Sequence, residues 1–247
     1  MTLHRFRVDL HLHTVLSPCA EVEMIPPLIV RQALALGLDL IAVTDHNATH
    51  NIQAVQAAAA GTPLVVWPGM EVQTREEVHV LCLFDDNARA AAWQALVDAA
   101  LPPLRNDPDH FGGQFVVDAT GDFIREHTQL LLTSTAFSLE EVVAQVDELG
   151  GVAIPCHVDR PTFSLLSQLG FVPPTLNVLA LEVSARLTIA QAVSRWPQLQ
   201  RWTLIQNGDA HRLSEMINRT CLEIAEPSIA ELRLALTHRE QRRVVVG

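Results

Sequence analysis

The segment Asp9-Leu-His-Leu-His-Thr14 places two histidines at alternate positions of a short predicted β-strand. Side chains two residues apart in a strand point to the same side, so His11 and His13 can converge on one metal ion. The preceding residues, 6–10, have the pattern of a strand that is about to end. The pair is therefore expected at the carboxyl end of that strand.

Five later segments repeat this arrangement, with histidine, aspartate or glutamate next to a β-like apolar run. They are Thr44-Asp-His-Asn47, Gly69-Met-Glu71, Val78-His-Val80, Cys156-His-Val158 and Gly208-Asp-Ala-His211. Of the 11 histidines in the chain, those at the boundaries of apolar runs are His11, His13, His46, His79, His157 and His211. Imidazole and carboxylate ligands without clustered cysteines suit zinc, manganese or iron.

Apolar runs alternate with helix-like segments along the chain. Strands are expected at 6–10, 39–44, 64–71, 78–84, 152–155, 179–183, 202–206 and 243–246, and helices at 26–36, 51–60, 88–100, 139–149 and 229–237. This alternation is typical of an α/β fold with a parallel sheet, and about seven core strands favour a (β/α) barrel. In such a barrel the strand ends share one face, where these folds place their active sites. An open sheet would spread the same residues along an edge.

Residues 104–137 interrupt the alternation. They contain strand-like runs at 114–117 and 123–126, separated by a turn at 119–122. A hairpin inserted into the main domain is expected here. Because no long linker, repeat or low-complexity segment is visible, residues 1–247 are predicted to form a single domain with this insertion.

Composition narrows the class of partner. The net charge is −11 with neutral histidines, which argues against a large nucleic-acid surface, because such surfaces are basic. A short nucleotide remains compatible, since bound metal ions attract phosphate. No oligomeric state is predicted.

The sequence has no features of a targeted or membrane-bound chain. Its most hydrophobic segment, 24–43, is interrupted by prolines and charged residues and is not expected to span a membrane. No secretory signal pattern is present, and the four cysteines are scattered without a CxxC pair. A cytoplasmic location is expected.

The ordered series DLHLHT, TDHN, GMEV, EVHVL, CHVDRP and GDAH resembles the PHP (polymerase and histidinol phosphatase) superfamily of metal-dependent phosphoesterases. The series covers residues 7 to about 213, nearly the whole chain. The resemblance implies a distorted seven-stranded (β/α) barrel, with two or three divalent metal ions in a cleft at the strand ends.

Matched residue by residue, the resemblance implies a ligand set. His11, His13, Glu71 and Asp209 would hold a first ion. Glu71 would bridge to a second ion held by His79 and His157, and His46 and His211 would hold a third. Some relatives place another histidine near the position of Cys19, and others an aspartate. Cys19 is therefore either a third-site ligand once it is deprotonated or a buried thiol.

These ligands imply a reaction. Glu71, Asp209 and His211 are expected to be catalytic, because two or three cations lower the pKa of a bridging water to near neutrality. The resulting metal-bridged hydroxide would attack phosphorus in line while the ions neutralise the developing charge. Asp9 and Asp45 are expected to orient imidazoles through their second ring nitrogen.

Arginines near the same strand ends are candidate substrate-binding residues. Arg160 follows His157, Arg186 follows the expected strand 179–183, and Arg212 adjoins His211. Each could bind a phosphate with two parallel hydrogen bonds, and the alternative for each is a surface ion pair.

The leading hypothesis is a phosphoesterase that acts on a small phosphorylated substrate, with a nucleotide or a nucleoside bisphosphate as the first choice. The alternatives are a histidinol-phosphate phosphatase, a short-oligonucleotide exonuclease and a non-catalytic module stabilised by metal.

Overall fold

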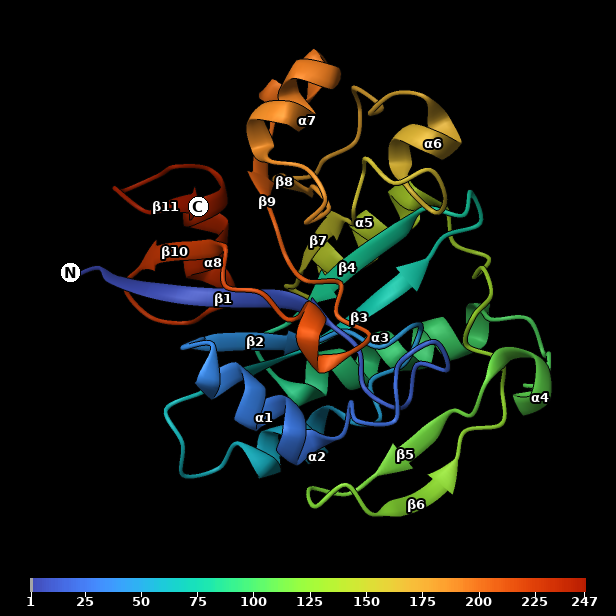
Figure 1. The fold of residues 1–247 in the computed structure, drawn as a ribbon. Helices are drawn as coiled ribbons and strands as arrows, with labels where there is room; N and C mark the ends of the chain where they lie inside the picture. Colours follow the sequence, from blue (N-terminus) through green and yellow to red (C-terminus); the bar gives the residue numbers. More distant parts are fainter. Residues whose placement is uncertain (1) are drawn as a thin grey trace.

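The computed structural model describes residues 2–247 and has a mixed α/β fold built on one curled sheet (Figure 1). The seven strands of this sheet follow the order β11-β10-β1-β2-β3-β4-β7. Their bounds are His4–Leu12 (β1), Leu40–Val43 (β2), Val65–Gln73 (β3), His79–Leu83 (β4), Val152–Pro155 (β7), Thr220–Ile224 (β10) and Arg243–Val246 (β11).

The centre of the sheet is parallel and its flanks are antiparallel. β2 pairs in parallel with β1 and β3, and all its side chains are buried, as expected for a strand covered on both faces. β4 runs antiparallel to β3 and β7, and β10 runs antiparallel to β1 and β11. The prediction of a parallel sheet is therefore correct only for the centre. It missed β10, a short strand whose buried and half-exposed residues alternate.

The curled sheet is a half-barrel, and the predicted closed barrel is not confirmed. The short strands β8 (Ala180–Glu182) and β9 (Thr203–Ile205) pair only with each other among the described strands. Hydrogen bonds near the strand ends connect this pair to its surroundings. Val158 N, after β7, donates to Glu182 O at 2.8 Å, and Leu10 N of β1 donates to the Asn207 side chain at 2.9 Å. Gln206, after β9, makes two hydrogen bonds with the Thr220 hydroxyl of β10, at 3.0 and 2.6 Å. Apolar side chains of β1, β2, β7, β8, β9 and α8 (Ile229–Leu236) pack together inside the curl.

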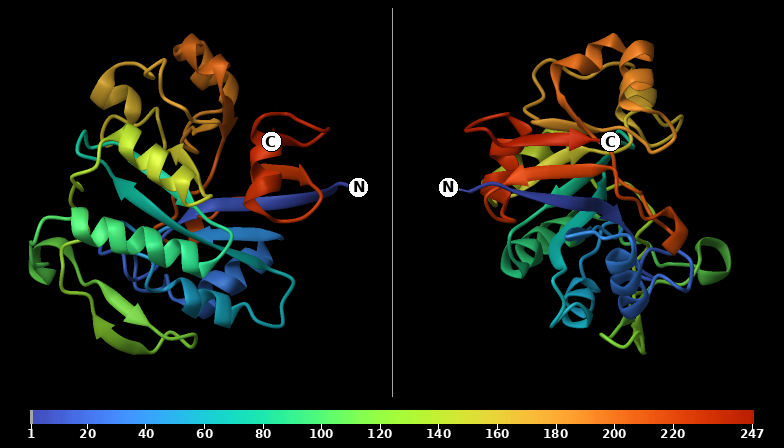
Figure 2. Two further views of the ribbon diagram at one scale, coloured as in Figure 1. Left: turned by 180° about the vertical axis from the view of Figure 1, so that it is seen from behind. Right: turned by 60° about the vertical axis from the view of Figure 1, so that its left-hand side comes forward.

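Helices α3 (Asn87–Ala100) and α5 (Leu139–Glu148) cross the back of the curl, whereas α8 packs inside it (Figure 2). The main helices agree with the sequence-based prediction to within a few residues: α1 is Pro26–Ala35, α2 Ile52–Ala58, α3 Asn87–Ala100 and α5 Leu139–Glu148. The short α6 (Leu165–Leu169) and α7 (Ile189–Arg195) were not predicted. No described helix is both long and apolar enough to cross a membrane.

The insertion contains the predicted hairpin, formed by β5 (Phe115–Val117) and β6 (Phe123–Glu126), and a short helix α4 (Pro108–Phe111). Backbone contacts connect it to the loop after β1, because Phe115 N donates to Val15 O at 3.0 Å. Asn51 also donates to Phe115 O at 2.9 Å. This segment therefore lies against the loops that carry the histidine motifs.

Candidate metal centre

The histidine and carboxylate motifs converge at one end of the curled sheet. Glu71 lies on β3, and His11 lies near the end of β1. His79 is the first residue of β4, which lies beside the end of β3 because the two strands are antiparallel and Gln73 pairs with His79. His157 follows β7, and Asp209 follows β9. The direction of β4 thus differs from the prediction, but the predicted residues still converge at one end of the sheet.

Glu71 is the centre of the cluster. Its Oε1 lies 2.9 Å from His79 Nδ1, 3.1 Å from His157 Nε2 and 3.3 Å from His11 Nε2. Its Oε2 lies 3.0 Å from His46 Nδ1 and 3.3 Å from His13 Nε2. The carboxylate is fully buried. A carboxylate surrounded in this way can face more than one cation.

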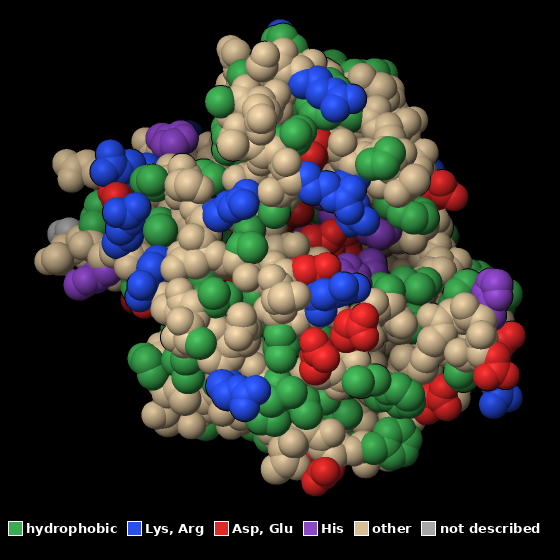
Figure 3. All heavy atoms as spheres, viewed as in Figure 1, with side chains coloured by type: hydrophobic (Ala, Val, Ile, Leu, Met, Phe, Trp, Pro, Cys, Tyr) green, Lys and Arg blue, Asp and Glu red, His purple; other side chains and the backbone are tan. Residues whose placement is uncertain are grey.

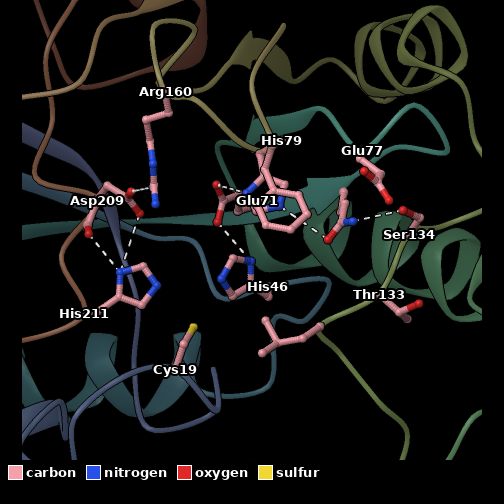
Figure 4. A pocket seen from close by; sticks show the side chains of 13 residues that line it. Cys19, His46, Glu71, Glu77, His79, Thr133, Ser134, Arg160, Asp209 and His211 are labelled. Carbon is pink, nitrogen blue, oxygen red and sulfur yellow. Dashed lines mark hydrogen bonds and ion pairs between the residues drawn. The ribbon is translucent and has the colours of Figure 1, made fainter. Parts of the chain in front are cut away.

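Asp209 and His211 complete the cluster on the side of Glu71 that faces away from His79 (Figure 4). Asp209 Oδ1 lies 3.4 Å from His11 Nε2 and 3.5 Å from His13 Nε2. The His211 ring stacks on the His13 ring with centroids 4.1 Å apart. Asp209 has a φ of 48°, a conformation that is uncommon outside glycine and is often found at functional sites.

The donor atoms form groups suited to metal ions. Ligand atoms lie within 4.8 Å of one another in the sets His11-His13-Glu71-Asp209, His46-Glu71-His79 and His13-His46-His211. The first set has the membership that the resemblance implies for the first ion. In the other two sets, His46 lies beside Glu71 and His79 as well as beside His211.

Several of these atoms lack a hydrogen-bond partner within the described chain. His11 Nε2, His13 Nε2 and Glu71 Oε2 are buried and make no hydrogen bond. Leaving such groups unsatisfied is costly, so native structures usually supply a partner. A divalent cation would satisfy all three atoms at once, and the residues present therefore fit a metal site.

Burial and neighbouring charges shift the pKa values of several groups in the cluster. Burial alone would raise the pKa of Glu71, but His79, His11 and His46 hold it well below its usual value. Burial opposes protonation of His13, yet Asp209 and Glu71 raise its pKa to about 9. Burial lowers the pKa of His79 to about 4 and that of His211 to about 3. Metal binding at this centre must therefore displace protons from some imidazoles.

Glu182 is a buried carboxylate that the sequence-based prediction missed. It accepts hydrogen bonds from His11 Nδ1 at 3.1 Å, from His157 N at 3.0 Å and from Asn207 Nδ2 at 2.7 Å. The first of these fixes the His11 tautomer and leaves Nε2 free to bind a cation. Its position at the end of the predicted strand 179–183 was the signal that could have identified it.

Asp9 and Asp45 do not contact imidazoles in the predicted way. Asp45 accepts from Ser17 Oγ at 2.7 Å, and this hydroxyl lies 2.9 Å from His13 Nδ1, so the aspartate acts on His13 through a serine. Asp9 accepts from the backbone N–H groups of Gly208 and Ile217, each at 2.9 Å. Burial raises its pKa to about 7. Asp9 therefore ties the loop before Asp209 to β1.

Cys19 is exposed and lies at the edge of the cluster. The thiol is close enough to His46 to help raise the pKa of that buried imidazole to about 9, against the effect of burial. Cys19 is not part of the group formed by His13, His46 and His211. The alternative that Cys19 is a buried thiol is therefore wrong. A role for Cys19 as a metal ligand stays a prediction.

Two adjoining cavities open above the cluster. The histidine cavity, of about 530 Å³, is lined by residues that include His46, Glu71, His79 and Phe163. The arginine cavity, of about 570 Å³, is lined by residues that include Ser184, Arg186 and Arg212. Both share Cys19, Arg160, Asp209 and His211. Histidine and acidic side chains lie in a hollow with cationic side chains at its rim (Figure 3).

The three candidate arginines reach this hollow in different states. Arg160 pairs with Asp209 Oδ2, an expected ligand, and its side chain is 31% exposed. Arg186 is exposed and has no ion-pair partner among residues 2–247. Arg212 pairs with Glu21 at 3.5 Å and Glu215 at 3.4 Å, so it forms the surface ion pairs that were the alternative to substrate binding.

Comparison with known proteins identifies the fold. No family model matches the sequence, and no curated protein matches it. The lesion-specific endonuclease PfuEndoQ from Pyrococcus furiosus has a similar structure, with a TM-score of 0.71 and 18% identity over 98% of this chain. An endonuclease Q complex with a 27-mer duplex substrate that carries an abasic lesion at the active site gives 0.71 and 16% over 97%. This chain spans only 58% of the length of either structure.

A two-domain protein from Bacteroides vulgatus, which contains a predicted PHP-like metal-dependent phosphoesterase, is also similar. The TM-score is 0.57 and the identity 16%, covering 99% of this chain and 65% of that chain. The chain therefore shares the fold of PHP-like phosphoesterases and of endonuclease Q, in agreement with the sequence resemblance. The similarity to an endonuclease Q complex that contains a duplex conflicts with the expectation, made from the net charge of this chain, that it has no large nucleic-acid surface.

Proposed function

We propose that this protein is a metal-dependent phosphoric ester hydrolase of the PHP superfamily that acts on a small nucleotide. The observation that carries the proposal is the buried carboxylate of Glu71, which faces five imidazoles. Two of these imidazoles, those of His11 and His13, have a buried Nε2 without a hydrogen-bond partner in the described chain. We further propose that residues 1–247 form one domain around this centre, with 104–137 as the insertion.

The proposed ligands follow the sequence resemblance, and the first set also coincides with a group of ligand atoms in the structure. His11, His13, Glu71 and Asp209 hold one ion, Glu71 with His79 and His157 a second, and His46 with His211 a third, which Cys19 joins as a thiolate. When bound, zinc, manganese or iron would activate water and neutralise phosphate oxygens. Glu71, Asp209 and His211 are the proposed catalytic residues, because they lie at the floor of the hollow that the substrate must enter.

The arginines bind the anionic part of the substrate. Arg160 reaches both cavities and is placed to bind the scissile phosphate, after exchanging its contact with Asp209. Arg186, exposed and without a carboxylate partner within residues 2–247, can bind a further phosphate in the arginine cavity, with Arg212 at its rim. Guanidinium groups suit this role because they form two parallel hydrogen bonds with phosphate.

The test is a phosphate-release screen on protein stripped of metal and reloaded with zinc, manganese or ferrous iron. The substrates are nucleoside monophosphates and bisphosphates, histidinol phosphate and sugar phosphates. Short oligonucleotides are tested in parallel by chromatography of the products, because cleavage of a phosphodiester releases nucleotides and not inorganic phosphate. Metal-dependent release of phosphate from nucleotides supports the proposal. Glu226→Gln, which changes an exposed carboxylate outside the centre, should release phosphate at the same rate as the wild-type protein and is the control variant. A protein that is fully metallated but inert on every ester is instead a non-catalytic module, and preference for histidinol phosphate identifies that phosphatase.

A second candidate is a nuclease that acts on damaged DNA. The likeness to endonuclease Q over nearly the whole chain favours it. The net charge of −11 disfavours it, because a duplex is held mainly by cationic contacts to phosphates. Nicking of a duplex that contains an abasic site, with no phosphate release from mononucleotides, would select this candidate.

A further inference from the structure

Phe163 presents an aromatic ring to the histidine cavity in a backbone conformation that is unusual for a bulky residue. Its φ is 54°, in the left-handed region. The ring lies nearly parallel to the His79 imidazole, with centroids 5.0 Å apart and an interplanar angle of 17°. The residue is nevertheless 39% exposed and lines the cavity. One side of the ring is therefore packed on His79, while the residue remains accessible.

Hydrogen bonds hold this conformation. Phe163 O accepts from His79 N at 3.2 Å, which fixes the loop to the start of β4. The next residue, Ser164, donates from Oγ to Arg160 O at 2.6 Å and caps α6 by accepting from Ser167 N at 3.2 Å. Strained residues held in this way by their surroundings cluster at ligand-binding sites.

The charged side chains around the hollow favour different chemical groups of a substrate in the two cavities. Apart from the proposed metal ligands and Arg160, the charged side chain that lines the histidine cavity is Glu77, and its carboxylate makes the outer part of this cavity a poor place for a second phosphate. The arginine cavity, on the other side of the Arg160–Asp209 pair, contains Arg186. An uncharged planar group fits beside Phe163, whereas anionic groups fit beside the arginines.

We propose that Phe163 is the stacking platform for the purine or pyrimidine ring of the substrate, and thus determines the specificity of this site. The proposal rests on the phosphoesterase function proposed above and names the group that its substrate carries. Aromatic side chains bind nucleobases through their π-faces, with little dependence on which base is present. Residues 157–164 would then contact both the base, through Phe163, and the phosphate, through Arg160.

The kinetic test compares adenosine monophosphate with ribose 5-phosphate, which has no base. Phe163→Ala is expected to raise KM for the nucleotide roughly 5- to 100-fold, the range for loss of one base–aromatic stack, with little change in kcat. KM for ribose 5-phosphate should not change, and Phe163→Trp should restore nucleotide binding. Phe171→Ala removes another phenylalanine, 53% exposed and outside both cavities, and is the matched control. Equal effects on both substrates, or none, would overturn the proposal.

A binding test does not depend on turnover. The tryptophan of Phe163→Trp should be quenched by adenosine monophosphate and not by ribose 5-phosphate, after subtraction of the wild-type signal. Absence of this quenching overturns the stacking proposal, whereas quenching without hydrolysis of any ester overturns only the phosphoesterase function. Repeating the titration with a short single-stranded oligonucleotide distinguishes a free nucleotide from a nucleic-acid strand as the source of the base.

Discussion

Glu71 faces five imidazoles through two oxygens, so its loss affects every ion that the centre can hold. In Glu71→Ala we expect loss of more than one metal equivalent and a fall in kcat of more than about 100-fold, beyond the 10- to 100-fold typical of removing an outer partner. Metal analysis and phosphate release on the same sample measure both. Near-normal turnover with full metal content would show that Glu71 is not a ligand.

Glu182 acts on the centre from outside, by accepting the His11 Nδ1 proton. Glu182→Gln removes the negative charge from that hydrogen bond, and we expect metal affinity to fall by about 10- to 100-fold. Competition with a chromophoric chelator measures the affinity, with Glu226→Gln as the control. Unchanged metal affinity would mean that Glu182 has only a structural role, in its hydrogen bonds to the loops that follow β7 and β9.

We propose that Arg160 binds phosphate, because its guanidinium carries a permanent charge and has no lone pair to offer a cation. Arg160→Ala removes charge-assisted hydrogen bonds worth about 1.5–3 kcal/mol, and kcat/KM for a nucleotide should fall roughly 10- to 100-fold. Arg160→Lys should restore only part of this rate, because lysine lacks the planar fork. Metal content should stay the same. Loss of metal in Arg160→Ala would instead indicate that its contact with Asp209 is structural.

At the scale of single elements, α5 begins with a reciprocal cap. Glu141 N donates to Ser138 Oγ at 3.1 Å, and Ser138 N donates to Glu141 Oε2 at 2.7 Å. Ser138→Ala should lower the free energy of unfolding by about 1 kcal/mol. For a chain of this size that is a fall in Tm of about 2–4 °C by calorimetry. Ser194→Ala, at an exposed position within α7 that takes no part in the cap of that helix, is the control.

Elements with a distinct apolar run or composition could be predicted from the sequence, including the short β8 and β9, whereas β10, α6 and α7 could not. β2 and α3 were predicted because their patterns extend over most of a strand or several helical turns. The pairing direction of β4 was wrong, because local sequence does not encode which neighbour a strand meets. β10 pairs with β1 across more than 200 residues of chain, and no local pattern announces such a partner.

The candidate site was predictable where the residue type and its place next to an apolar run coincide. Each predicted histidine of the centre lies in the cluster for that reason. Glu182 was missed because it has no histidine beside it in the sequence, and a lone carboxylate at a strand end is more often solvated or paired with a cation. The contact of Asp45 with His13 through Ser17 depends on a loop conformation, which the sequence pattern does not specify.

On the scale of the whole molecule, metal binding should stabilise the fold in a pH-dependent way. The pKa of His13 and that of His46 are raised from 6.5 to about 9, so these imidazoles stabilise the metal-free fold below pH 6.5 and lose that effect as the pH rises towards 9. Metal binding instead requires them to be neutral. We therefore expect the gain in Tm on adding zinc to be larger at pH 8.5 than at pH 6.5.

Scanning calorimetry of chelator-treated and reloaded protein at several pH values measures this gain. The same titration with Glu71→Ala should show little gain at any pH. A gain that is constant across the range would mean that the ions do not compete with protons at these imidazoles.

The loop between β7 and α6 brings Arg160 and Phe163 together while leaving all the proposed ligands except His157 on other segments. Both side chains nevertheless touch the centre, because Arg160 pairs with Asp209 and the Phe163 ring stacks on His79. A mutation that rewrites this short stretch of the gene would thus act on substrate preference and on the metal ligands together, so under the proposed function a new specificity would have to evolve with compensating changes around the ions.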